Sequence, residues 1–584
     1  MDILNSTDRL WDLRRGDADD NRTSPQGRGW RKLAFSAALE FNYLMAPIAF
    51  LALVIGPALL IGLAPFVLVA FGRRNIEAAA AIAGHPVAAF VSLAVLVGVA
   101  AGIGRPLVVR AVDNFWHLHY TLVFPVFVVL RELICAAAER LPGQTMTAEQ
   151  LFRRRRVGTV LATLLLAGVG LMLALGVRFS TDPALVDARE VTALAGAALR
   201  NAAVVLGVST VAASLYWLWR EIRSSLPVLD WVSGAEAAGF GTAVRVAHLS
   251  DLHAVGGRHG YRMESGTHGP RGNRKIRCAL RKLASIHAAA PLDHIVVTGD
   301  ITDAGTRDEW MEVADLLRHG PELPARVLFV PGNHDVNVVD RTNPGRLDLP
   351  WSVGQALRKL RVVLTLDAIQ GDRVHVVDHA SGAIGPLLED YLRDGPRPGR
   401  LRALAAHGTW RGRREISRVW DEIFPLIVQP PTKGGCGVIM LDSNARRHFS
   451  LTNAIGVVGR AQLRALTSVL RASPERAWMI LIHHHIVDYP IRSIALSERI
   501  GVALINAPDV LDAIASHASP VVVLHGHRHR AWVGTRGEVV LCSAPSVALG
   551  SKSADTPRGG FHVYDFASCS DGGLRLTALE RVIV

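Results

Sequence analysis

Five short polar motifs constrain the fold most, because each stands where a run of aliphatic residues ends. HIVVT precedes Gly299-Asp300, for example, and VVVLH precedes Gly526-His527. Runs of this kind are typical of buried strands, and strand ends are where α/β sheets place their functional groups. The motifs are Asp251-Leu252-His253, Gly299-Asp300, Gly332-Asn333-His334-Asp335, His483-His484-His485 and Gly526-His527-Arg528-His529. We therefore expect them to gather at one edge of a layered α/β domain.

The side chains in these motifs are metal ligands by their chemistry. Carboxylate and amide oxygens mixed with imidazole nitrogens suit divalent ions such as Mn, Fe or Zn. One ion takes about four to six ligands, so a set of this size predicts two ions. We expect Mn or Fe, with Zn as the alternative. Each motif alone also fits a turn or a helix cap, but five in succession favour a metal site.

The order and spacing of the motifs resemble the calcineurin-like metallophosphoesterase superfamily, and within it the class III cyclic-nucleotide phosphodiesterases. The resemblance covers residues 243–566. Two further stretches match: Leu441-Asp442-Ser443, with a downstream Gly459 and Gln462-Leu463, and Ser543-Ala544-Pro545-Ser546. The resemblance implies a four-layer α/β/β/α sandwich over residues 240–584. The residue pattern agrees, because it predicts amphipathic helices at 277–290 and 461–471 and a further helix at 307–319 between short strands.

The resemblance also implies a role for each residue. The implied ligands are Asp251 and His253 at the first ion, Asp300 between the ions, Asn333 at the second ion, and His527 and His529 with one at each ion. His334 resembles the family's non-ligand histidine, which contacts the phosphate and protonates the leaving alkoxide. Asp303 and Asp335 either orient ligating side chains or cap helices, and both interpretations stay open.

The triple histidine leaves the last ligand ambiguous. The family usually has His-His-Pro here, and the first histidine is the ligand. Ile486 stands where that proline would fall if His484 and His485 take the two histidine positions. On this alignment His484 is the expected ligand, and His483 is the alternative.

The composition of the first part of the chain predicts a membrane region. Half of all residues are hydrophobic, and a bilayer-spanning helix needs about 20 apolar residues. After a polar, basic tail over residues 1–40, we expect a transmembrane region over residues 41–224. Its spans are predicted at about 46–72, 80–104, 157–177 and 199–219. Residues 114–130 are uncharged but shorter, which favours an interfacial or re-entrant segment.

Arginine placement predicts the orientation of these spans. The N-terminal tail and the loop containing Arg153-Arg154-Arg155-Arg156 are the most basic flanks, and positive flanks face the cytoplasm. With four spans, both ends of the chain lie on that side. We expect an integral protein of a bacterial inner membrane with a cytoplasmic catalytic domain. The net charge of +13 comes without a basic stripe interleaved with aromatics, so no nucleic-acid polymer is expected as a partner.

Two insertions depart from a minimal domain of this family. The loop at 254–275 starts at the site, and its Arg258 either contacts an anionic substrate or belongs to a solvated loop. The longer insertion, about 336–436, contains a helical pattern (WSVGQALRKLRVVL) and a strand-like RVHVVD, and its length predicts a cap over the site.

The expected function is hydrolysis of a phosphodiester, of cyclic-nucleotide type, by a membrane-anchored enzyme that uses two metals to activate water as hydroxide. One alternative is a hydrolase of a lipid phosphodiester or pyrophosphate headgroup at the inner leaflet. A second alternative is a membrane sensor or transport-like protein with a regulatory metal domain. The expected partners are therefore a small phosphodiester or lipid phosphoester, and the membrane itself.

Overall fold

The computed structural model divides into two compact units, one taking in residues 226–584 and the other residues 38–144 and 153–225. It describes residues 62–63, 123–140, 147–177, 191–223, 227–231, 243–256, 272–318, 323–336, 353–430, 435–444, 455–474, 476–490, 504–517, 519–549, 559–568 and 573–584. The basic tail, the first two predicted spans apart from residues 62–63, and Arg258 lie outside these residues.

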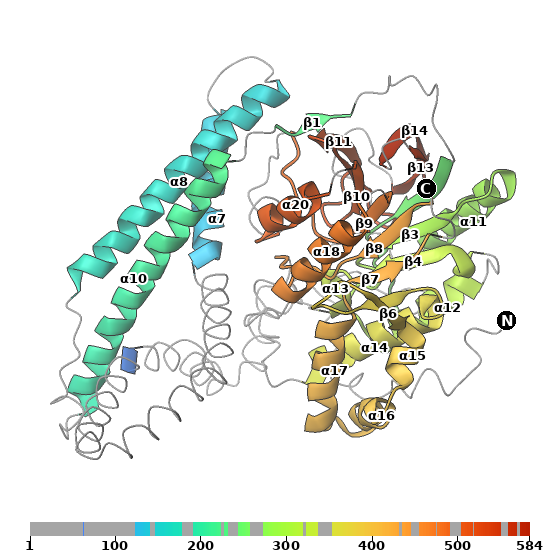
Figure 1. Cartoon of the computed structure of the whole chain (residues 1–584), viewed down its shortest axis with the longest axis horizontal. Coiled ribbons are helices and arrows are strands. Elements are labelled where there is room, and N and C mark those ends of the chain that lie inside the picture. Colours follow the sequence, from blue (N-terminus) through green and yellow to red (C-terminus); the bar gives the residue numbers. More distant parts are fainter. Residues whose placement is uncertain are drawn as a thin grey trace, which may run out of the picture. The chain divides into compact units, whose positions relative to one another are not determined.

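The larger unit is built on two sheets (Figure 1). The smaller sheet has the strand order β14-β13-β2-β3-β4. Its strands are β2 (Ala243–Leu249), β3 (His294–Thr298), β4 (Val327–Val330), β13 (Gly560–Ser568) and β14 (Leu574–Ile583). Strands β2, β3 and β4 run parallel, so their carboxyl ends reach the same edge, while β13 and β14 close the other side in antiparallel fashion.

The larger sheet has the order β1-β11-β12-β10-β9-β8-β7-β5-β6. Its strands are β1 (Leu229–Asp230), β5 (His375–Val377), β6 (Ile384–Leu387), β7 (Leu426–Val428), β8 (Gly437–Met440), β9 (Trp478–Leu481), β10 (Val521–His525), β11 (Trp532–Arg536) and β12 (Val539–Ser543). Its centre, from β8 through β9 and β10 to β12, is parallel. The carboxyl ends of these strands therefore also share an edge.

The helices supply the outer layers. They are α11 (Arg274–Ala289), α12 (Arg307–Arg318), α13 (Asn333–Val336), α14 (Val353–Gln370), α15 (Leu388–Arg393), α16 (Arg397–His407), α17 (Trp410–Ile423), α18 (Arg460–Ala472) and α20 (Ala507–Ala515), with a 3-10 turn, η4, at Pro324–Arg326. The predicted helices at 277–290, 307–319 and 461–471 correspond to α11, α12 and α18.

Side-chain alternation along β9 shows how the layers stack. Trp478 and Ile480 pack in the cluster that includes α18 and α20, whereas Met479 and Leu481 pack in the core shared with the smaller sheet. Successive strand residues point to opposite faces, so the larger sheet is buried on both. This arrangement is the expected α/β/β/α sandwich.

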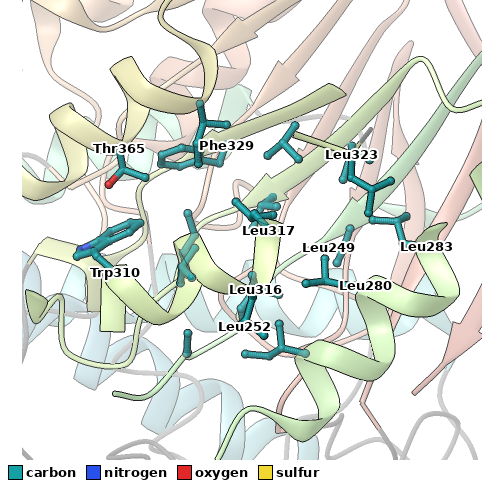
Figure 2. A pocket seen from close by; sticks show the side chains of 18 residues that line it. Leu249, Leu252, Leu280, Leu283, Trp310, Leu316, Leu317, Leu323, Phe329 and Thr365 are labelled. Atoms are coloured by element: carbon teal, nitrogen blue, oxygen red, sulfur yellow. The ribbon is translucent and has the colours of Figure 1, made fainter. Parts of the chain in front are cut away.

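A small apolar cavity lies under the helices of the smaller sheet. Helices α11, α12 and α14 and strands β2 to β4 contribute its walls, and Figure 2 shows Trp310, Leu316 and Phe329 among the lining side chains. Leu252 lines it too, although its neighbours in sequence are two of the predicted ligands. The walls expose only apolar surface, so the cavity is no place for a phosphate.

The described part of the long insertion belongs to the sandwich. Strands β5, β6 and β7 extend the edge of the larger sheet, and the buried side chains of α14 and α17 join the central core. The expected cap is therefore not seen over residues 353–430, which continue the layers instead. The strand-like RVHVVD is β5, and the WSVGQALRKLRVVL pattern is α14.

The smaller unit contains helices α7 (Phe124–Arg140), α8 (Ala148–Gly176) and α10 (Val191–Arg223). Two stretches, Ala148–Gly176 and Thr192–Arg223, are long and apolar enough to cross a membrane. They correspond to the third and fourth predicted spans. Gly170 and Gly207 allow close backbone contact between them, since an added Cβ at Gly207 would lie 2.6 Å from the Gly170 carbonyl oxygen.

Candidate metal centre

The five motifs converge because both sheets present their carboxyl ends to one place. Asp251 and His253 follow β2, Asp300 follows β3, and Asn333 begins α13 directly after β4. From the larger sheet, the triple histidine follows β9, and the motif with His527 and His529 follows β10. All of these side chains are buried except that of His529, which is partly exposed.

The backbone at this site is strained. Among the residues that the structure describes, five other than glycine have a positive φ angle, and every one of these five is a predicted ligand: Asp251, His253, Asp300, His527 and His529. Asp and His tolerate this region better than most residues, but the conformation still costs free energy. Gly526 permits the close approach of two strand ends, because a Cβ there would lie 1.7 Å from the Ser250 hydroxyl oxygen.

One group of donors surrounds the position expected for the first ion. His529 Nε2 lies 3.3 Å from Asp251 Oδ1 and 3.4 Å from His253 Nε2. His253 Nε2 lies 3.9 Å from Asp300 Oδ2. Its other nitrogen, Nδ1, lies 3.2 Å from the Asp303 carboxylate, which orients the ring so that Nε2 faces the group.

A second group of donors lies on the other side of Asp300. His483 Nε2 lies 3.4 Å from Asp300 Oδ1, 3.1 Å from Asn333 Oδ1 and 3.0 Å from His527 Nδ1. His483 Nδ1 lies 2.7 Å from the Thr298 carbonyl oxygen and donates its hydrogen there, which orients the ring so that Nε2 faces the other donors.

Asp300 therefore presents one carboxylate oxygen to each group, as a bridging ligand would. Burial alone would raise its pKa, but the neighbouring histidines, His483 first, hold the pKa well below its usual range. Burial would likewise lower the pKa of His483, yet the Asp300 and Asp251 carboxylates raise it to about 9. The field at the site favours positive charge, so the donor set and its electrostatics both fit divalent cations.

The structure differs from the expectation at the triple histidine. His483, and not His484, brings a ring nitrogen into the second donor group. His484 instead directs Nδ1 toward the Ser443 hydroxyl at 2.7 Å, while its ring lies against that of His527 with centroids 4.3 Å apart. Ser443 belongs to the Leu-Asp-Ser stretch noted in the sequence, and it fixes the orientation of His484.

His334 lies beside both donor groups, and it forms a further cluster with His253 and Asp303, in which one ligand atom from each residue lies within 4.8 Å of the other two. Its ring contacts that of His253 with centroids 4.6 Å apart, and its backbone N–H donates to Asp300 Oδ1 at 2.8 Å. Its Nδ1 lies 2.7 Å from the Asp303 carbonyl oxygen. This bond fixes the Nδ1–H tautomer and leaves Nε2 for another partner.

Asp335 ties the two loops of the smaller sheet together. Its carboxylate accepts hydrogen bonds from the backbone N–H groups of Ile301, Thr302 and Gly332, at 3.2, 2.8 and 2.8 Å, and from the Thr302 hydroxyl. Asp335 thus supports the backbone of the loops that carry candidate ligands.

One supporting group was not singled out from the sequence, and two stretches that were noted there also support the centre. The Thr298 carbonyl orients His483, and a backbone carbonyl leaves no signature in residue type. Gln462 holds Asp442 in place: its side-chain oxygen accepts from the Asp442 N–H and its nitrogen donates to the Asp442 carbonyl, both at 2.8 Å. The Ser546 hydroxyl donates to the Asp251 carbonyl at 2.7 Å, so the Ser-Ala-Pro-Ser stretch also supports the centre.

Comparison with known proteins defines the class of this domain. Residues 244–425 match the family described as calcineurin-like phosphoesterase, so the chain contains a metallophosphoesterase domain. The match includes the first three motifs, while His483, His527 and His529 lie beyond it and are brought to the site by the fold.

Individual relatives are more distant. A protein described as a probable cyclic nucleotide phosphodiesterase from Coxiella burnetii is 28% identical over 102 residues, which cover 17% of this chain and 36% of that protein. A dimetal phosphatase from Danio rerio is 15% identical with a TM-score of 0.33, covering 58% of this chain and 98% of its own. A putative 5'-nucleotidase from Staphylococcus aureus is 12% identical with a TM-score of 0.32, covering 59% of this chain and 54% of its own.

Proposed function

We propose that this chain is a phosphodiesterase that holds two divalent metal ions. The observation that carries the proposal is Asp300, whose two oxygens face two separate donor groups. The ligands would be Asp251, His253, Asp300 and His529 for the first ion, and Asp300, Asn333, His483 and His527 for the second. When bound, such ions supply Lewis acidity to phosphoryl oxygens and activate water near neutral pH.

His334 is the residue of this chain that we assign to proton transfer. The Asp303 carbonyl accepts the Nδ1–H, so in the imidazolium form the second ring proton is on Nε2, which would deliver it to the leaving alkoxide and leave the neutral Nδ1–H ring. Because the Asp300 carboxylate also accepts from the His334 backbone, the general acid and the bridging ligand keep a fixed relation.

A cyclic-nucleotide-type phosphodiester is the substrate class we favour. Its support is the similarity to the Coxiella burnetii protein, of which this chain spans only about a third. A lipid phosphodiester is the second candidate, and the two long apolar helices favour it because they would place the enzyme at a membrane.

The test uses the full-length purified chain with Mn²⁺ and a panel of diesters: an aryl phosphodiester, cyclic nucleotides and lipid phosphodiesters in detergent. We expect hydrolysis of the aryl diester that a chelator abolishes. Asp300→Asn should lower bound metal and turnover together, by more than any other single ligand change. Undiminished activity in chelated enzyme would overturn the two-metal proposal.

We also propose that the enzyme is an integral membrane protein of a bacterial inner membrane, with the metal centre in the cytoplasm. Helices α8 and α10 support anchoring by their length and composition. The arginine distribution supports the orientation, because positive flanks face the cytoplasm.

A further inference from the structure

The first helix of the long insertion carries two buried arginines that reach toward the metal centre. Arg358 and Arg361 lie on α14, with 4% and 1% of their surface exposed. Burying a guanidinium is costly unless its N–H groups are satisfied, so such residues generally serve a specific arrangement. The groups that these two arginines contact therefore indicate the role of α14.

Both arginines donate to backbone carbonyls in the loops that carry ligands. Arg361 donates to the carbonyl of Gly305 at 3.0 Å, at the end of the loop that follows Asp300. Arg358 donates through Nε to the carbonyl of Val336 at 2.9 Å, at the end of the turn that carries Asn333. Each ligand loop is thus fixed at its far end by α14.

Gly305 shows how closely the helix and the loop fit. Its φ angle is +68°, and a Cβ there would lie 2.6 Å from the Asp335 carbonyl oxygen and 2.8 Å from Arg358 Cδ. The loop therefore rests on the arginine stem while its carbonyl accepts from Arg361. No side chain fits between them.

We propose that α14 is a positioning element of the metal centre, in which Arg358 and Arg361 fix the two loops that carry the bridging carboxylate and the general acid. This role rests on the proposed phosphodiesterase function. On this proposal, the insertion positions the ligand loops and does not cover the site. His334 lies between the two fixed points, because its Nδ1 bonds to the Asp303 carbonyl in one loop and its backbone belongs to the other.

Arg373 provides a matched control. It follows α14 and donates to the carbonyls of Pro324, Val327 and Ile369 at 3.1, 3.0 and 2.7 Å. These contacts are of the same kind, but they lie at the amino end of β4, whereas the ligands follow its carboxyl end. A change at Arg373 should disturb packing without disturbing the ligand loops.

The experiment compares R358K, R361K and R373K in the full-length chain. Lysine keeps the charge but loses the planar fork of donors. Three quantities are measured: the Mn²⁺ affinity by calorimetry, the melting temperature, and kcat and KM for aryl phosphodiesters with good and poor leaving groups. We expect R358K and R361K to lose at least about tenfold in Mn²⁺ affinity and in kcat, with KM within about twofold, because small displacements of reacting groups are costly.

The kcat loss should be larger for the poor leaving group, which depends on the position of His334. R373K should keep both the Mn²⁺ affinity and kcat, whatever its melting temperature. If R358K and R361K match R373K in affinity and kinetics, α14 is a packing element only and the proposal fails.

Gly305→Ala extends the test to the loop side and covers the case in which an arginine variant does not fold. It keeps both arginines in the sequence but forces the loop away from Asp335 and from the Arg358 stem, so it should reproduce the loss of Mn²⁺ affinity and kcat. Normal values in this variant would also overturn the proposal. If the wild-type chain binds Mn²⁺ but hydrolyses none of the diesters, the proposed function fails, and the affinities still decide whether α14 positions the loops.

Discussion

At the scale of single residues, the triple histidine offers a direct test of the ligand set. His483→Ala should remove the second ion, because Nε2 of His483 faces Asp300, Asn333 and His527. His484→Ala should keep both ions and lower their affinity more mildly, because that ring packs against a ligand and bonds to Ser443. Metal content by mass spectrometry distinguishes the two variants. The reverse ranking would return the ligand role to His484.

His334 is the second residue whose role can be isolated. His334→Ala should keep both metals but lower kcat by about 100-fold or more, because general-acid help is lost. The deficit should shrink for substrates with good leaving groups, which need little protonation. Steady-state kinetics on a series of aryl phosphodiesters measures this dependence. Equal losses across the series would mean that His334 binds phosphate and transfers no proton.

At the scale of strands and helices, the sequence predicts where most of the candidate ligands lie along the chain. It does not predict which of the three consecutive histidines faces the candidate centre. Asp300 and His527 each come just after an aliphatic run. Such a run is by itself enough to predict that both residues follow the end of a strand. The three histidines after β9 are consecutive in sequence. A shift of one residue along an extended chain turns the side chain to the opposite face, so neighbouring histidines face different ways. The bond from His483 to the Thr298 carbonyl, made across two sheets, and the bond from His484 to Ser443 together turn His483 toward the centre.

The long insertion shows the same limit of what the sequence alone can predict. Its helix α14 and strand β5 were both visible in the pattern of residues, but their destination was not. Strand β5 has three residues, and it pairs with β7, about fifty positions later. Edge pairing between short, distant strands leaves no local signal, and a long insertion near a site therefore looked like a cap.

One element carries a pH-dependent contribution to stability. His294 begins β3, and burial lowers its pKa to about 4. A histidine whose folded-state pKa is depressed stabilises the fold above its ordinary pKa of about 6.5, and that contribution is lost as the pH falls toward 4.

We expect the melting temperature of the wild type to fall more steeply than that of His294→Gln between pH 7 and pH 4. The metal ligands titrate in both chains, so their effect cancels in the difference. Thermal unfolding across this range measures the two curves. Parallel curves would show that His294 is protonated equally well in the folded chain.

At the scale of the whole molecule, the helical unit predicts which side of a membrane holds the metal centre. Arg154 donates to the Ala138 carbonyl and Arg156 to the Ile222 carbonyl, at 2.9 and 3.1 Å, near the C-terminal ends of α7 and α10. The basic run and the exit of the chain toward the catalytic unit therefore share one end. Positive flanks face the cytoplasm, so the catalytic unit should too.

Topology reporters test this orientation. A reporter fused after Val584 should be active only if it requires the cytoplasm, and one near residue 145 should behave in the same way. A reporter inserted between α8 and α10 should give the opposite result and serves as the control. An external signal near residue 145 would overturn both the span count and the cytoplasmic assignment.

The left-handed backbone of the five candidate ligands has a consequence for how the sequence of such a protein can change in evolution. Each of these positions costs on the order of 1 kcal/mol or more, and glycine would remove the cost. Stability alone therefore favours losing the very side chains that form the centre. If a related protein no longer needed metal, replacing these five side chains by glycine would increase its stability. This chain has Asp or His at all five positions, each with a positive φ angle.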